Sequence, residues 1–189
     1  MTKVIIAHGW TGHPEYVWYP HTKRELEAKG FEVVVPAFPD TNAPELTTWL
    51  PTLTAAVGEP EADLILVGHS LGCALILRYL ESLTDGVQIA GVIFVAGFTD
   101  HMGHDPMQNF FQTPIDFAKI KARVRHFTFI HSDNDPYVAT HYAEQLQQQL
   151  GGEVILKSGV GHFSTSPEGV ICEELPEVIE SVEALSAHT

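Results

Sequence analysis

Six short runs of almost continuously apolar, largely β-branched residues recur along the chain and alternate with longer helical patterns. Such runs, without alternating polar residues, are typical of strands buried on both faces, as in a parallel sheet. They cover residues 4–7, 31–35, 64–67, 92–95, 127–130 and 154–156. The helical patterns cover about 20–30, 46–57, 70–83, 143–150 and 175–185. This alternation predicts a doubly wound α/β fold: a mostly parallel sheet of about six strands with helices on both faces, folded as one domain over residues 1–189.

The order of the elements also predicts where chemistry takes place. In doubly wound sheets, ligands bind outside the carboxyl ends of the strands, so the residues that follow each run are the candidates. Two helix details are expected as well. Pro51 lies inside the pattern 46–57 and predicts a kink or a split there, and the third helix is expected to begin at Ser70.

The segment Gly68-His69-Ser70-Leu71-Gly72 follows the third run and opens a helical pattern. It matches G-x-S-x-G, the turn that carries a nucleophilic serine between a strand and a helix. Side chains at Gly68 or Gly72 would clash where the strand and helix pack closely. The alternative is a tight turn with a helix-capping serine, since serine is a favoured N-cap residue. The strand–turn–helix setting favours Ser70 as a nucleophile.

A serine nucleophile needs a histidine base that is oriented by a carboxylate. His162 lies in a glycine-flanked loop after the last run, and Asp135 lies in an acidic turn after the fifth. Both follow Ser70 in the order serine, acid, histidine that this motif requires. Asp133 and Asp100 also lie at strand ends and are the competitors for the acid. We expect Asp135 because it directly precedes Pro136, which stiffens the turn.

An oxyanion hole needs two backbone N–H groups near the nucleophile. Leu71, the residue after the serine, supplies one, and Trp10, in the glycine-flanked turn after the first run, supplies the other. Two further histidines, His8 and His69, flank this centre. We interpret both as packed, hydrogen-bonded neighbours and not as second bases.

Composition limits the partners of the chain. The formal net charge of −14 disfavours binding to nucleic acid or to an anionic membrane. The densest basic group, residues 119–125, is interpreted as a solvated helix end that leads into a strand. Cys73 and Cys172 are expected to be reduced and apolar in character. The short apolar start, Met1 to Ala7, is not a signal peptide, so we expect a cytoplasmic protein.

A metal site is not expected, although the chain has 11 histidines. His101, His104 and Asp105 form the one close cluster, and we interpret it as a solvent-exposed loop. A zinc site needs three or four ligands in fixed geometry. The prediction is therefore a metal-independent site without a cofactor.

Taken together, the segments around these residues resemble the YdeN-like serine hydrolases, small α/β-hydrolases related to retinoblastoma-binding protein nine. The resemblance rests on the segments 8–12, 18–20, 68–72, 133–136 and 161–163 and covers nearly the whole chain. It implies an α/β-hydrolase fold with little or no lid and no cofactor. By motif it implies Ser70 as nucleophile, Asp135 as acid and His162 as base. His21 departs from the pattern, since the resemblance implies another aromatic residue there.

These features predict a serine hydrolase that cleaves small esters, with amide or peptide bonds as alternatives, through an acyl-enzyme on Ser70. The alternative from another class is a binding or scaffold protein with a protein partner and little turnover, since fold alone does not fix function. The aromatic side chains expected to bind substrate are Trp18, Phe98, Phe110 and Phe163. Apolar residues between 98 and 113 either bind an acyl chain or pack beneath a long loop. Without a large lid, short acyl groups are expected to be preferred.

Overall fold

Six parallel strands form one sheet in the computed structural model, which describes residues 1–165 and 171–187. The strand order is β2-β1-β3-β4-β5-β6, and every neighbouring pair is parallel. The strands are β1 (Lys3–Ala7), β2 (Glu32–Val34), β3 (Ile65–His69), β4 (Ile89–Val95), β5 (Val124–Ser132) and β6 (Glu153–Lys157). Each of the six apolar runs lies on one of these strands, so the prediction of a doubly wound parallel sheet is confirmed.

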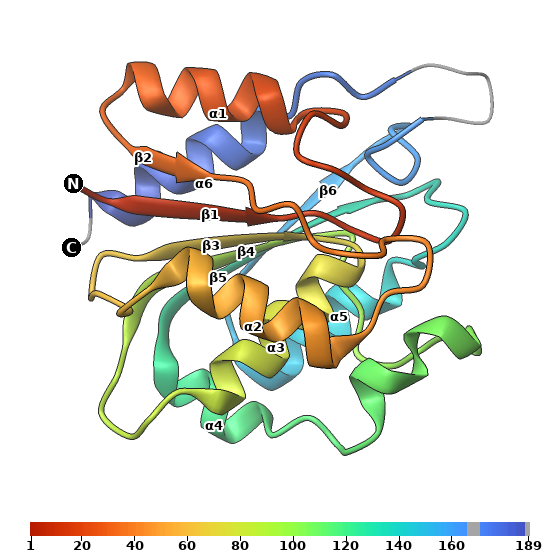
Figure 1. Ribbon diagram of the computed structural model, residues 1–189. Coiled ribbons are helices and arrows are strands. Elements are labelled where there is room, and N and C mark those ends of the chain that lie inside the picture. Colours follow the sequence, from red (N-terminus) through yellow and green to blue (C-terminus); the bar gives the residue numbers. More distant parts are fainter. Residues whose placement is uncertain (166–170, 188–189) are drawn as a thin grey trace.

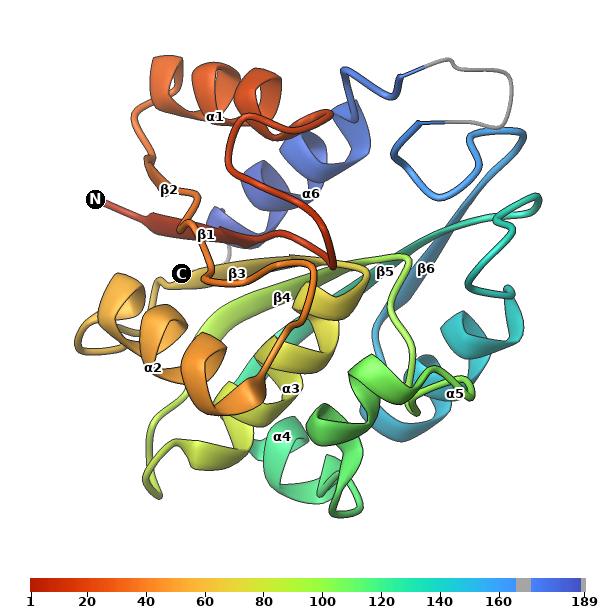
Figure 2. The ribbon, with the colours of Figure 1, turned by 45° about the vertical axis from the view of Figure 1, so that its right-hand side comes forward.

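Helices cover both faces of the sheet (Figure 1). One face carries α1 (Tyr19–Ala28) and α6 (Pro176–Ser186), and the other carries α2 (Leu46–Val57), α3 (Leu71–Ser82), α4 (Phe117–Arg123) and α5 (His141–Leu150). Figure 2 shows the same two layers after rotation. The short 3-10 helix η1 (Asp105–Phe111) contacts α3. None of the helices described combines the length and the apolar composition that a membrane span requires.

The core lies between the central strands and α3. Every residue of β3 and β4 is buried, which explains why their sequences do not alternate between apolar and polar residues. The first ten residues of α3 are buried too, including Arg78. The Arg78 guanidinium donates to the carbonyl oxygens of Phe110 and Thr113 and pairs with Glu81, so its charge is compensated and it fastens the segment after β4 to α3.

The structure excludes the split that was one of the two expectations at Pro51, and it corrects the start of the third helix. α2 continues through Pro51 as one helix and is not split there, because Trp49 and Leu53 are buried on either side of the exposed proline. α3 begins at Leu71 and not at Ser70, because Ser70 has a positive φ of 54° that no α-helical residue adopts. The basic segment 119–125 ends a helix that leads into a strand, namely α4 and β5, but it is not solvated throughout, because Arg123 is buried and pairs with Asp85.

The strand order predicts a crevice at the carboxyl ends of β1 and β3. From β1 the chain winds to β2 on one side, and it then returns to β3 and continues to β6 on the other. A parallel sheet of this kind opens a crevice where the winding direction reverses, at the carboxyl ends of the strands. The loops that follow β1, β3, β5 and β6 therefore converge on one edge of the sheet, and they hold the candidate residues.

Candidate active site

Ser70 occupies a strained turn between β3 and α3. Its φ and ψ are 54° and −120°, and its side chain makes no cap hydrogen bond to α3. The turn is held instead through the backbone: the Ser70 N–H donates to the Val95 carbonyl at 2.9 Å, and the Ser70 carbonyl accepts from the Cys73 N–H at 2.9 Å. The hydroxyl is thus free of the capping role that was the alternative explanation of this serine. A strained turn at a candidate nucleophile is a common feature of functional sites.

The glycines of the motif permit close contact between β1, β3 and α3. A Cβ built at Gly72 would lie 2.1 Å from the Ala7 carbonyl oxygen, and one at Gly68 would lie 2.8 Å from the Cys73 Cα. Both are backbone atoms that cannot move aside. The predicted clash at these two positions is therefore confirmed.

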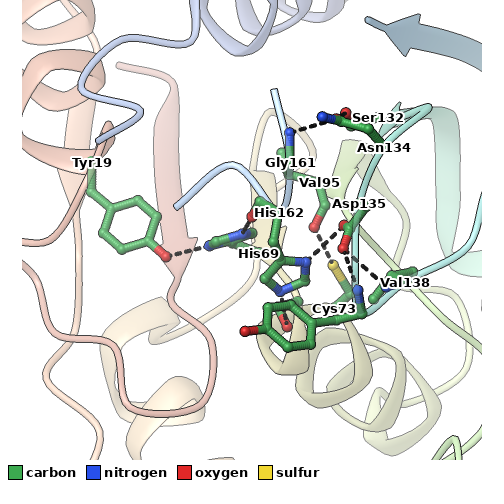
Figure 3. A network of polar contacts seen from close by, with 12 residues as sticks. Tyr19, His69, Cys73, Val95, Ser132, Asn134, Asp135, Val138, Gly161 and His162 are labelled. Atoms are coloured by element: carbon green, nitrogen blue, oxygen red, sulfur yellow. Dashed lines mark hydrogen bonds and ion pairs between the residues drawn. The ribbon is translucent and has the colours of Figure 1, made fainter. Parts of the chain in front are cut away.

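Ser70, His162 and Asp135 form a continuous hydrogen-bonded chain. His162 Nε2 lies 2.9 Å from Ser70 Oγ, and His162 Nδ1 lies 2.7 Å from Asp135 Oδ2. Figure 3 shows the Asp135 carboxylate beside the imidazole of His162. The N–H groups of Tyr137 and Val138 donate to its other oxygen, Oδ1, at 2.8 and 3.0 Å. Because a carboxylate only accepts, Nδ1 carries the proton and Nε2 faces the hydroxyl as an acceptor.

The competing aspartates are engaged elsewhere. The Asp133 carboxylate accepts from Ser158 Oγ at 2.7 Å and from the Gly159 N–H at 2.9 Å, and these hydrogen bonds lower its pKa. Asp100 accepts from the Met102 N–H at 2.7 Å and from the Tyr142 hydroxyl at 3.1 Å. Of the three aspartates, only Asp135 contacts the imidazole.

Asn134 ties together the two loops that carry the acid and the base. Its Oδ1 accepts from the Gly161 N–H at 2.8 Å and from Ser132 Oγ at 2.8 Å (Figure 3). The loop after β5 and the loop after β6 are thereby joined beside His162. Sequence reasoning missed this role; its signal was the position of Asn134 between two aspartates at a strand end.

Of the two candidate oxyanion donors, Leu71 directly follows Ser70, and Trp10 belongs to the turn after β1. The turn after β1 passes close to the serine, since a Cβ built at Gly9 would lie 3.0 Å from the Ser70 Cβ. In this turn the N–H of Thr11 donates to Thr41, and that of Gly12 donates to Gly9. No hydrogen bond from the backbone N–H of Trp10 occurs among the residues described, whereas its indole N–H donates to the Asn42 carbonyl at 3.2 Å. Leu71 is the first residue of α3, so its N–H has no acceptor within the helix.

His69 is a buried neutral imidazole that anchors the backbone of His162. The Tyr19 hydroxyl donates to His69 Nδ1 at 2.6 Å, and His69 Nε2–H donates to the His162 carbonyl at 2.8 Å (Figure 3). Burial, and then the neighbouring His162, lower the pKa of His69 to about 3. His69 is thus a packed, hydrogen-bonded neighbour, as expected, but its link to His162 was not predicted.

His8 lies beneath the turn after β1. Its Nδ1 donates to the Gly9 carbonyl at 3.0 Å, and its Nε2 accepts from the Phe38 N–H at 3.3 Å. Burial lowers the pKa of His8. Both ring nitrogens are used, so His8 supports the turn as the packed neighbour that was expected.

A cavity of about 490 Å³ opens beside Ser70 and His162. Its walls are apolar and aromatic, and no aspartate, glutamate, lysine or arginine lines it among the residues described. Besides Ser70 and His162, the residues that line it are Gly9, Trp10, Thr11, Gly12, Tyr16, Tyr19, His69, Met102, His104, Met107, Tyr137, Val138, Ser164 and Thr165. The segment before and within η1 therefore forms a short wall of the cavity, and no helical lid domain occurs in the chain as described.

The four aromatic residues predicted to bind substrate do not line this cavity, which corrects that expectation. Trp18, Phe98, Phe110 and Phe163 are all fully buried in the core. Trp18 packs on Tyr19 at a ring distance of 4.6 Å, and Phe110 packs on Trp49 at 5.8 Å. Phe98, which lies 5.9 Å from Phe111, and Phe163 complete this packing beneath the loops. These four rings bury large apolar areas against core neighbours, and aromatic composition alone does not distinguish such a ring from one that lines a cavity.

The histidines of the loop after β4 do not converge on a ligand. The His101 carbonyl accepts from the His104 N–H at 2.8 Å, and His101 Nδ1 accepts from the Gly103 N–H. Within residues 1–165 and 171–187, no group of three His, Cys, Asp or Glu side chains that could hold a metal ion is found. Cys73 and Cys172 are free thiols.

Comparison with known proteins identifies a family and several relatives of this chain. The family model described as serine hydrolase matches residues 4–180. A protein named as a hydrolase, YdeN of Bacillus subtilis (strain 168), is 34% identical over 165 residues, which are 86% of this chain and 87% of that protein. The serine hydrolase RBBP9 of Rattus norvegicus is 26% identical over 186 residues, or 96% of this chain and 95% of that protein.

Solved structures agree on the fold. The crystal structure of the ydeN gene product from B. subtilis has a TM-score of 0.91 at 29% identity and covers 99% of this chain and 100% of that one. The α/β-hydrolase domain-containing protein 10 from mouse has a TM-score of 0.70 at 16% identity, covering 98% of this chain and 90% of that one. The second likeness shows the α/β-hydrolase fold alone.

Proposed function

This chain belongs to the serine hydrolase family, and on that premise we propose that it hydrolyses small ester substrates through an acyl-enzyme formed on Ser70. The observation that carries the proposal is the unbroken chain from Asp135 Oδ2 through His162 to Ser70 Oγ, with contacts of 2.7 and 2.9 Å. These separations are within direct proton-transfer distance. Amide and peptide bonds are open to the same chemistry.

The acylation step follows from the proton positions. His162 Nε2 accepts the Ser70 hydroxyl proton while Oγ attacks the ester carbonyl carbon. The carbonyl oxygen becomes an oxyanion, and the N–H groups of Trp10 and Leu71 stabilise it. When the intermediate collapses, the bond to the alkoxy oxygen breaks and His162 returns the proton to the leaving alcohol. The acyl group remains on Ser70 as an ester.

Deacylation repeats these steps with water. His162 Nε2 accepts a proton from water as its oxygen attacks the acyl carbon, and it then returns that proton to Ser70 Oγ as the acid is released. Asp135 stabilises the transient imidazolium charge and holds Nδ1–H in place. The side chain of Asp135 is only 1% exposed, so water hardly competes for this contact.

The cavity favours small, uncharged acyl groups. No carboxylate, ammonium or guanidinium group lines it among the residues described, so nothing there compensates a charged substrate group. Its volume of about 490 Å³ lies at the small end of the range for ligand pockets. A long acyl chain would extend past these walls into water, where additional methylenes contribute no burial.

The test is turnover of p-nitrophenyl acetate by the wild type and by Ser70→Ala. Loss of a triad serine typically costs about 10⁴-fold or more in turnover. Ser164→Ala is the matched control, because Ser164 also lines the cavity but contacts neither His162 nor Asp135 in the hydrogen bonds described. We expect Ser164→Ala to keep turnover within a few-fold of wild type. A folded Ser70→Ala protein with wild-type turnover would refute the assignment.

A further inference from the structure

β6 presents one open edge of the sheet. It pairs with β5 on one side and is the last strand in the sheet order. The Lys157 carbonyl accepts from the Asp133 N–H on the β5 side, so the backbone polar groups of Glu153, Ile155 and Lys157 face β5. By alternation, those of Val154 and Leu156 face outward. No described residue pairs with this outer side.

The centre of this edge strand lacks the features that usually prevent edge pairing. Proteins protect edge strands with proline, bulges or a charge at the centre of the strand. β6 reads Glu153-Val154-Ile155-Leu156-Lys157, with three apolar residues at its centre and its charges only at the ends. The Leu156 side chain is 58% exposed.

We propose that a second copy of this chain pairs with β6 edge to edge, antiparallel, with Ile155 on the two-fold axis. In this register Glu153 lies opposite Lys157 of the partner subunit, and Val154 lies opposite Leu156 of the partner subunit. The outward-facing Val154 and Leu156 form the hydrogen-bonded pairs of the ladder. Glu153 and Lys157 form non-hydrogen-bonded pairs, in which side chains are closest and opposite charges attract most.

The charge pattern of β6, with Glu153 at one end and Lys157 at the other, favours a second copy of this chain as the partner. The strand is self-complementary only in the antiparallel register centred on Ile155, where both charged ends meet opposite charges. A register shifted by two residues places Glu153 opposite the partner's Ile155 and leaves the charges unpaired. Lys157 also pairs with Glu177 within its own chain, but an ammonium group has three donors and serves both carboxylates.

The pairing is expected to be weak and dependent on concentration. The strand is short, and two copies that each carry a formal charge of −14 repel one another, so added salt screens that repulsion. Sedimentation velocity over a concentration series should show a wild-type monomer–dimer equilibrium. Val154→Pro removes an outward N–H without breaking the β5 ladder, and it should leave only monomer.

Charge exchange tests the register directly. Glu153→Lys places like charges opposite one another at both ends and should weaken association about tenfold. The double variant Lys157→Glu with Glu177→Gln should also weaken association about tenfold. Glu177→Gln is included so that the new carboxylate at position 157 does not face the carboxylate of Glu177. Mixing these two variants should restore a dimer, because their edges are then complementary. Glu32→Lys, the same change on the opposite edge strand, is the control and should not alter association.

Three outcomes would overturn the proposed dimer, and a folding control is needed to interpret them. Circular dichroism melting of every variant separates loss of pairing from loss of folding. A wild type that stays monomeric at all concentrations would overturn the proposal. A folded Val154→Pro protein that still forms dimers, or mixed charge variants that form no heterodimer, would also overturn it, the first by excluding this edge and the second by excluding this register.

Discussion

His69→Phe tests whether His69 positions the base. The substitution keeps a flat ring of similar size but removes both polar contacts of the imidazole. The His162 carbonyl then loses its donor at 2.8 Å, and the Tyr19 hydroxyl loses its acceptor at 2.6 Å. The His162 carbonyl and the Tyr19 hydroxyl would then lack their partner at a position where His69 is only 3% exposed. Water therefore replaces the two lost hydrogen bonds poorly.

The expected magnitude follows from those two contacts. A buried polar group left without a partner costs about 1–3 kcal/mol, so the loss of both contacts should lower the free energy of unfolding by about 2–6 kcal/mol. A domain with a stability of about 10 kcal/mol, the middle of the usual range, stays folded after that loss. The larger effect is expected on kcat, because a displacement of about 1 Å in a catalytic group can cost about 100-fold. KM should change less than kcat, because both lost hydrogen bonds are made to protein groups, although Tyr19 and His69 also line the cavity.

The assay is kcat and KM for p-nitrophenyl acetate together with urea unfolding. His69→Gln is the conservative control, because its amide N–H can replace Nε2–H toward the His162 carbonyl. We expect it to recover part of the kcat lost in His69→Phe. The positioning role would be refuted if folded His69→Phe kept wild-type kcat. A larger loss in KM than in kcat would instead indicate that His69 acts on substrate binding.

Three further outcomes are expected. Asp135→Asn should reduce kcat far more than Asp100→Asn or Asp133→Asn in ester assays, and a larger loss at either alternative would reassign the acid. Burial lowers the pKa of His69 to about 3 and of His131 to about 4, so the unfolded chain binds more protons below about pH 6.5. Stability is therefore fully present above that pH, and the free energy of unfolding should fall by about 2 kcal/mol between pH 6.5 and 5.5; an unchanged urea midpoint would contradict this. In a p-nitrophenyl series from acetate to palmitate, kcat/KM should be highest among short chains, and a steady rise to palmitate would show that the cavity holds long chains.

The sheet and the polar chain at its edge could be predicted because the relevant signals are local. Buried parallel strands leave continuous apolar runs, and the residues after them must meet at one edge. That rule placed Ser70, Asp135 and His162 together without any distance information. The conformation of Ser70 itself was less accessible, because a favoured N-cap residue and a strained nucleophile look alike in sequence.

The cavity walls could not be predicted because aromatic composition does not distinguish a core ring from a pocket ring. Phe98 and Phe110 pack inward, while Tyr137, in the turn after β5, is 65% exposed and lines the cavity. The link from Tyr19 through His69 to His162 joins three distant parts of the chain. No local pattern encodes it, so only the folded arrangement reveals it.

The central claim is that Ser70 is the nucleophile, and covalent labelling measures this most directly. The wild-type protein would be treated with a fluorophosphonate, and the adduct located by mass spectrometry of its peptides. We expect one label per chain, on Ser70, with none on the Ser70→Ala variant. A folded protein that takes up no label, or carries it on another residue, would contradict the account.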